Sequence, residues 1–153
     1  NVKAQLEMGN YYVYPVDDIN SAIYWYEKAL ATSIKNHELA VMFEIYKKLA
    51  RVYNDIGKKK EMLVRVLTFK QMYPDCYIED YREEYSHAAF ELGHIFAPEK
   101  INKRSAAYCF TISYYTGNNY AEESLRILGY QLSEQETWSW RNDAQSLAFC
   151  SII

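Results

Sequence analysis

The chain repeats part of its own sequence at an interval of 84 residues. Residues 21–30 read SAIYWYEKAL and residues 105–114 read SAAYCFTISY, and the match continues without a gap over more than twenty positions. The clearest agreements pair Ala4 with Ala88, Gly9 with Gly93, Tyr12 with Phe96, Ala22 with Ala106, and Tyr26 with Phe110. Because small residues align with small ones and rings with rings, the repeat predicts two copies of one helix-turn-helix unit within an array of stacked units.

A third copy of the unit lies between these two. The segment LARVYNDIG places Ala50 and Tyr53 where the first copy has Gly9 and Tyr12, and Gly129 marks a further helix start. Successive units are therefore about forty residues apart, within the period range of helical repeat arrays. We expect one domain of four units, at residues 2–35, 37–75, 78–117 and 118–150.

The spacing of hydrophobic residues predicts an all-α protein with about eight helices. Apolar residues recur every three to four positions over residues 4–13, 22–30, 39–53, 62–69, 81–96, 102–117 and 121–132. An eighth helix over residues 133–149 begins at the SEQE segment, which matches a capping box, and would close the array as a C-terminal cap. With five glycines and three prolines, the chain has few turn signals, and no segment shows clean strand alternation.

Several residues predict where helices begin and end. Asp17 or Asp18 can cap the second helix, and Gly57 fits a C-terminal cap of the third. The three lysines at 58–60 follow that end, where their charges would suit the helix dipole. Pro74 stops the fourth helix.

Composition excludes some classes of function. The formal net charge of −3 argues against general nucleic-acid binding, which needs a basic face, and no apolar run approaches membrane-spanning length. Cys76, Cys109 and Cys150 are too widely spaced for a metal site and are best interpreted as buried hydrophobic residues. Such cysteines favour the reducing cytoplasm over the periplasm, which stays an alternative if a signal peptide was removed.

The sequence contains no catalytic or metal-binding constellation. His87 and His94 are seven residues apart, whereas two histidines that bind one metal from a helix prefer a spacing of four. Neighbouring carboxylates, such as Glu83 and Glu84, point about a hundred degrees apart on a helix and make poor acid–base pairs. We therefore expect a non-enzymatic protein without metal or cofactor. A hydrolase or transferase that uses Cys109 or a groove histidine is the alternative.

The repeat resembles a known family. Residues 18–29, which read D-x-x-S-A-x-x-W-Y-x-K-A, resemble the Sel-one-like repeat, a relative of the tetratricopeptide repeat. The middle unit is more similar to a plain tetratricopeptide, because Ala50 and Tyr53 precede Pro74 at that repeat's spacing. The chain departs from the Sel-one-like pattern where Cys109 replaces the expected tryptophan, and where the first and third units lack the Gly-x-Gly loop. The resemblance implies an α-solenoid of about four stacked antiparallel helix hairpins.

Close packing explains the residue types of the motif. Small residues let paired helices approach each other, and the rings beside them fill the gap between hairpins. The repeat positions expected to serve this packing are Gly9, Tyr12, Ala22, Trp25, Tyr26, Ala50, Tyr53, Gly93, Phe96, Ala106, Phe110 and Gly129.

The resemblance also implies where a partner binds. In a tetratricopeptide array the first helix of each hairpin lines a concave groove. The corresponding partner-binding candidates are Lys3, Asn10, Glu44, Lys47, Arg51, Asn54, His87, His94, Glu123, Arg126 and Tyr130. Lys47, Arg51 and Arg126 suit acidic groups or a C-terminal carboxylate.

These observations predict a scaffold that binds a protein or peptide in a concave, tyrosine-rich groove. The Sel-one-like resemblance implies two such roles in bacteria: an immunity protein that sequesters a toxin or effector, and an adaptor or chaperone in signalling or secretion. Self-association through exposed ends of the array is a third option.

Overall fold

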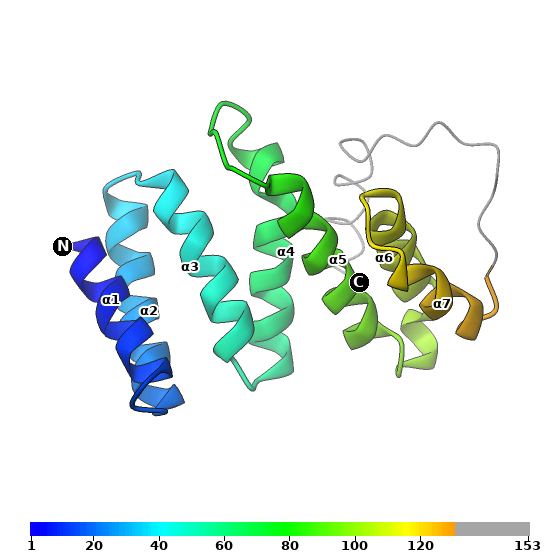
Figure 1. Cartoon of the computed structure of the whole chain (residues 1–153), viewed down its shortest axis with the longest axis horizontal. Helices are drawn as coiled ribbons and strands as arrows, with labels where there is room; N and C mark the ends of the chain where they lie inside the picture. Colours follow the sequence, from blue (N-terminus) through cyan, green and yellow to red (C-terminus); the bar gives the residue numbers. More distant parts are fainter. Residues whose placement is uncertain (131–153) are drawn as a thin grey trace.

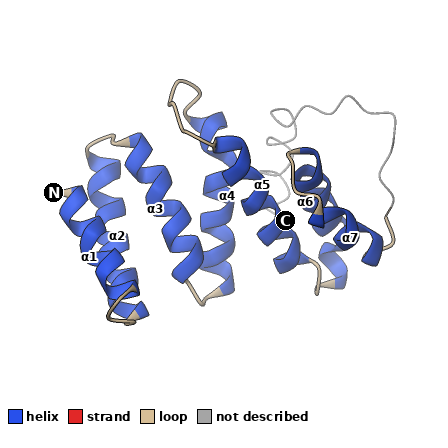
Figure 2. Ribbon diagram, in the orientation of Figure 1, coloured by secondary structure: helices blue, strands red, loops and turns tan. Residues whose placement is uncertain are grey.

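The computed structural model describes residues 1–130, and its regular secondary structure there is entirely helical (Figures 1 and 2). The elements are α1 (Val2–Val13), α2 (Ile19–Lys35), α3 (Leu39–Val52), α4 (Ile56–Met72), α5 (Tyr81–Phe96), the 3₁₀ turn η1 (Lys100–Asn102), α6 (Lys103–Tyr115) and α7 (Tyr120–Ile127). No strand occurs within residues 1–130, which confirms the all-α class. The expected eighth helix at 133–149 and its capping box lie outside the described residues.

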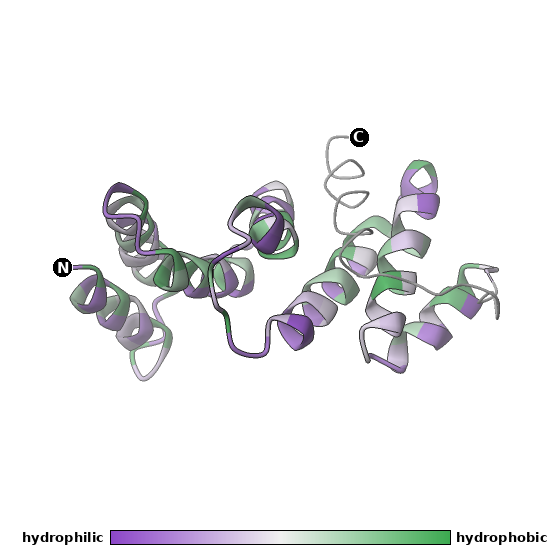
Figure 3. Ribbon diagram, turned by 90° about the horizontal axis from the view of Figure 1, so that it is seen from above, coloured by the Kyte–Doolittle hydropathy of each residue, from purple (hydrophilic) through white to green (hydrophobic). Residues whose placement is uncertain are grey.

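The helices follow one another in a row. Each helix packs mainly on the helices directly before and after it in the chain, and Figure 1 shows this order from α1 in blue to α7 in orange. Seen from above, each helix carries both hydrophobic and hydrophilic residues (Figure 3). The core is consequently a chain of helix–helix interfaces, which includes Tyr26, Leu49, Leu67, Tyr85 and Phe110 among its buried side chains.

Helix α2 begins at Asp18, one of the two expected caps. An oxygen of the Asp18 carboxylate accepts a hydrogen bond from the Ser21 backbone N–H at 3.1 Å, and the other accepts one from the Ser21 hydroxyl at 2.6 Å. These hydrogen bonds, the one from the hydroxyl first, lower the pKa of Asp18. The aspartate therefore remains ionised and stabilises the start of the helix.

The prediction that Gly57 caps the C-terminal end of the third helix is wrong. This glycine is the second residue of α4, because Asp55 starts α4 by accepting a hydrogen bond from the Lys58 backbone N–H at 3.0 Å. The three-lysine run thus lies at the beginning of α4, the positive end of its dipole. One of these lysines still serves the end of α3, since Lys59 Nζ donates to the Ala50 carbonyl oxygen at 2.5 Å.

Gly129 also differs from its expected role. It follows the end of α7 with a φ of +87°, and nothing lies within 4 Å of the position where its Cβ would be. A positive φ is easily adopted by glycine, and the Gly129 backbone N–H donates to the Arg126 carbonyl. Gly129 therefore forms the turn after α7, and within residues 1–130 it does not pack against another helix.

The two repeated glycines make the same contact in both copies. A Cβ on Gly9 would lie 2.4 Å from ring atoms of Tyr26, and a Cβ on Gly93 would lie 2.6 Å from a ring atom of Phe110. The two glycines are 84 residues apart in the sequence, and so are the two rings. Tyr26 and Phe110 are 2% and 1% exposed, so neither ring has room to move away. Each glycine thus lets two paired helices approach, as predicted, but the contacting ring lies within its own hairpin, against the preceding helix, and was expected between hairpins.

Most other repeat positions are also buried. Ala22 and Ala106 are fully buried, each on the helix that carries the contacting ring. Ala50, Tyr53 and Phe96 are buried as well. Tyr12 is partly buried against the core, and Trp25 is partly buried.

We predict that Gly93→Ala destabilises the protein by ~1–3 kcal/mol, because the new methyl group overpacks the α5–α6 interface. Urea denaturation measures the change in the free energy of unfolding. In open space the same substitution would stabilise a helix by roughly 0.8–1 kcal/mol, so the sign of the change tests the contact. A Phe110→Leu background should reduce the penalty, and a higher stability of Gly93→Ala in the wild-type background would contradict the close approach.

Candidate functional site: charged clefts beside α3

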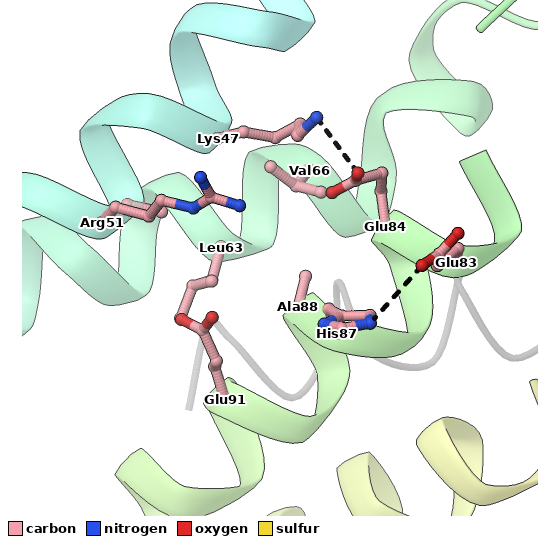
Figure 4. A pocket seen from close by; sticks show the side chains of 10 residues that line it. Lys47, Arg51, Leu63, Val66, Glu83, Glu84, His87, Ala88 and Glu91 are labelled. Carbon is pink, nitrogen blue, oxygen red and sulfur yellow. Dashed lines mark ion pairs between the residues drawn. The ribbon is translucent and has the colours of Figure 1, made fainter. Parts of the chain in front are cut away.

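A cleft opens between α3 and α5 above α4; we refer to it as the central cleft. It is lined by Lys47, Ala50, Arg51, Leu63, Val66, Glu83, Glu84, His87, Ala88 and Glu91 (Figure 4). Its volume is about 200 Å³, whereas pockets for small molecules usually measure roughly 300–1,000 Å³. The central cleft therefore suits individual side chains of a larger partner better than an enclosed small molecule.

The two walls of the central cleft carry opposite charges. Helix α3 supplies Lys47 and Arg51, which share a face because they are four residues apart. Helix α5 supplies Glu84 and Glu91 at helical spacing, together with Glu83. Between the walls, the buried side chains of Leu63 and Val66 form an apolar floor. The central cleft thus combines a basic wall, an apolar floor and an acidic wall.

Lys47 joins the two walls. Its Nζ lies 3.0 Å from an oxygen of Glu44 on the same helix and 3.2 Å from an oxygen of Glu84 on α5. The lysine side chain is only 19% exposed, so the ion pair with Glu84 is screened less than one at the surface. Lys47 is therefore already committed to holding α3 and α5 together.

Arg51 has no such partner. Figure 4 shows its side chain extending into the opening, and within residues 1–130 no carboxylate lies within 4.0 Å of it. Across the central cleft, Glu91 likewise lacks a basic partner in the described part of the chain. Oε1 of Glu83 lies 4.0 Å from Nε2 of the exposed His87, and this contact is an ion pair only when the histidine is protonated.

A second cleft lies on the other side of Arg51; we refer to it as the N-terminal cleft. It has a volume of about 270 Å³ and is lined by Asn10, Val13, Tyr26, Lys48, Arg51 and Val52. The Tyr26 hydroxyl donates a hydrogen bond to the Asn10 side-chain oxygen at 2.7 Å. Burial raises the pKa of Tyr26, while the charge of Arg51 opposes this shift, so the hydroxyl stays neutral. Among residues 1–130, the lining of the N-terminal cleft contains two cations, Lys48 and Arg51, and no carboxylate.

The structure brings together four of the predicted partner-binding residues. Asn10, Lys47, Arg51 and His87 line the two clefts, and Arg51 belongs to both. Glu44 lies beside them through its ion pair with Lys47.

The remaining candidates lie elsewhere. Glu123 and Arg126 pair with each other on α7 at 3.0 Å, and these contacts raise the pKa of Arg126 and lower that of Glu123. The His94 ring packs edge-on against Phe110 with centroids 5.0 Å apart, and Tyr130 lies beneath Lys103. Lys3 and Asn54 are exposed and line neither cleft.

Sequence reasoning missed the acidic wall and Lys48. Glu84 and Glu91 lie at helical spacing from His87, a signal that places all three on the same face. The adjacent positions of Glu83 and Glu84, by contrast, indicate only a poor acid–base pair. The two clefts contain less tyrosine than the sequence predicts for a groove: among the described residues, none lines the central cleft and Tyr26 alone lines the N-terminal cleft.

Other chemistry predicted from the sequence can be placed as well. Cys109 is fully buried on α6, in agreement with its interpretation as a core residue. In the described part of the chain, no group of three or more potential metal ligands comes together. None of the helices there is both long enough and apolar enough to cross a bilayer.

Comparisons of the chain with protein-family models, with curated proteins and with solved structures give no significant match. The fold defines the class of the protein, an all-helical chain whose helices pack in sequence order. The resemblance to Sel-one-like and tetratricopeptide repeats stays a prediction. The function must consequently be argued from the clefts themselves.

We predict an energetic coupling of ~0.2–1 kcal/mol between Lys47 and Glu84, because their ion pair connects two helices in a partly buried setting. A double-mutant cycle with Lys47→Met and Glu84→Gln, measured by urea denaturation, gives this coupling. The same cycle on the exposed Glu123–Arg126 pair, with Glu123→Gln and Arg126→Gln, serves as the control and should show less coupling. Equal coupling in both cycles would mean that Lys47 does not hold the cleft walls together.

Proposed function

We propose that the protein is a non-enzymatic scaffold of the α-solenoid type, which binds a segment of a partner protein across the two clefts joined by Arg51. The observation that carries this proposal is the position of Arg51. Its guanidinium is unpaired among the described residues and lies between a charged cleft and a basic one. An arginine that offers five donors without an internal acceptor is well suited to bind a partner's carboxylate.

Two features support the solenoid interpretation. Helices pack mainly on their neighbours in sequence, as expected of a repeat array. The Gly9–Tyr26 and Gly93–Phe110 contacts recur at the repeat interval, so both hairpins are built in the same way. In such an array the first helices of successive hairpins lie side by side. This arrangement accounts for the meeting of residues from α1, α3 and α5 around Arg51.

The shape of the clefts favours a short segment as the ligand. Both clefts are small, open onto α3 and have apolar floors or walls, to which Leu63, Val66, Val13 and Val52 contribute. An extended segment can place one side chain in each cleft and gain affinity from several modest contacts. This mode corresponds to the adaptor role. An immunity protein would instead need a larger preformed interface with one toxin.

The enzymatic alternative has less support. Cys109 is fully buried, so a substrate would not reach its sulfur without a rearrangement. The histidine in the central cleft, His87, has an acidic neighbour at 4.0 Å, but no serine, threonine or cysteine is among the described residues that line the same cleft. A nucleophile and its base need to lie within hydrogen-bond reach of each other.

We predict that Arg51→Glu abolishes capture of the main partner from a lysate of the source organism. The affinity-tagged protein and its variants are compared by quantitative mass spectrometry of the bound proteins. Arg51→Glu adds repulsion at the junction of the clefts and removes no internal ion pair of residues 1–130. Arg104→Glu makes the same change of charge at an exposed position on α6 and should leave capture intact.

Melting temperatures of both variants must match that of the parent protein within a few degrees. If the Arg51→Glu variant is folded and keeps the same partner, the clefts are not the binding site. The affinity of the purified pair then separates the two roles: a dissociation constant in the micromolar range indicates an adaptor, and one in the nanomolar range or below indicates a dedicated inhibitor.

A further inference from the structure

Resting on the proposed function, we propose that the clefts select a segment with separated charges. An acidic group of the segment binds at Lys48 and Arg51, and a basic group binds at Glu83 and Glu91. Apolar residues between these two groups cover the floor formed by α4. The proposal follows from the order in which charge changes sign from α3 to α5.

The basic end of this surface is the N-terminal cleft. Lys48 and Arg51 both line it, and no carboxylate of the described residues does. Asn10 accepts a hydrogen bond from Tyr26 through its side-chain oxygen. The amide N–H groups of Asn10 are not used by that bond and can donate to a ligand. Two cations and an amide donor favour a carboxylate, and the apolar neighbours Val13 and Val52 strengthen such contacts by excluding water.

The acidic end is the α5 wall of the central cleft. Neither Glu83 nor Glu91 has a lysine or arginine within 4.0 Å in the described part of the chain. Lys47 neutralises only Glu84 of this wall, because its two ion pairs are with Glu44 and Glu84. A lysine or arginine of the ligand would supply the missing positive charge.

A uniformly charged segment fits this surface poorly. If an acidic segment bound Arg51, its other carboxylates would lie beside Glu83 and Glu91. If a basic segment bound these glutamates, its other cations would lie beside Lys48 and Arg51. Like charges brought together in this way oppose binding and supply specificity. The required spacing is short. Side chains of the two walls reach each other, since Lys47 Nζ on α3 lies 3.2 Å from an oxygen of Glu84 on α5. An extended chain advances roughly 3.3 Å per residue, so about three residues span roughly 10 Å between the two charged groups.

The test uses four synthetic peptides with capped ends and a neutral fluorescent label. The separated peptide contains three aspartates, then Ala-Leu-Ala, then three lysines, and the interleaved peptide has the same composition with alternating charges. In the acidic peptide the lysines are replaced by glutamines, and in the basic peptide the aspartates are replaced by asparagines. Fluorescence anisotropy measures their dissociation constants for the whole chain at low and at physiological salt.

We expect the separated peptide to bind roughly fivefold more tightly than each of the other three. Arg51→Glu should weaken the separated and acidic peptides but not the basic one, whereas Glu91→Lys should weaken the separated and basic peptides. Arg104→Glu and Glu122→Lys are matched changes at exposed positions and should change nothing. If a charge reversal unfolds the protein, Arg51→Gln and Glu91→Gln replace it.

The outcomes separate this proposal from the proposed function. If the interleaved or the acidic peptide binds as tightly as the separated one, selection of separated charges is wrong, although the clefts still bind peptides. If no peptide binds but a partner is captured from the lysate in an Arg51-dependent way, the charge order is again wrong and the scaffold function stands. If no peptide binds and capture does not depend on Arg51, the proposed function itself fails.

Discussion

The arrangement of the helices depends on the close approach of a glycine to an aromatic ring. At Gly9 and at Gly93 the absence of a side chain lets a ring from the following helix lie against the backbone. Each hairpin is thereby closed at a fixed distance while its ring remains almost fully buried. Because a single hairpin cannot bury all of its apolar surface, the next helix must pack on it, and the order of packing follows the order of the chain.

This order of packing brings residues distant in sequence to one surface. Helix α4 packs between α3 and α5, buries Leu63 and Val66 at the bottom of the central cleft, and leaves the outer faces of α3 and α5 opposite each other. The Lys47–Glu84 ion pair joins these faces at one point. The clefts are therefore a consequence of helices packing in sequence order, and their chemistry is set by surface residues that this packing leaves unconstrained.

The features that the sequence predicts correctly depend on signals that lie close together in the chain. The bounds of α5, Tyr81–Phe96, follow from its periodicity and from Pro98, and the Gly–ring pairs follow from comparing the two copies. Gly57 follows an apolar stretch, as a C-terminal cap does, so the sequence predicts it at the end of α3. In the structure the N-terminal cap at Asp55 starts α4 before this glycine, and Gly57 therefore belongs to α4. The acidic wall escaped prediction because only the position of α4 decides which face of α5 borders a cleft.

Lys47 and Arg51 differ in their ion pairing, which indicates that they have different roles on α3. These residues are one helical turn apart on the same face, yet Lys47 has two carboxylate partners and Arg51 has none among the described residues. Glu91 lies on the opposite wall and is also unpaired there. An ion pair between Arg51 and Glu91 would add little stability at such an exposed position. It would, however, close the passage between the walls. Two separated charges keep the cleft open, and under the proposed function a ligand that supplies both opposite charges neutralises them together.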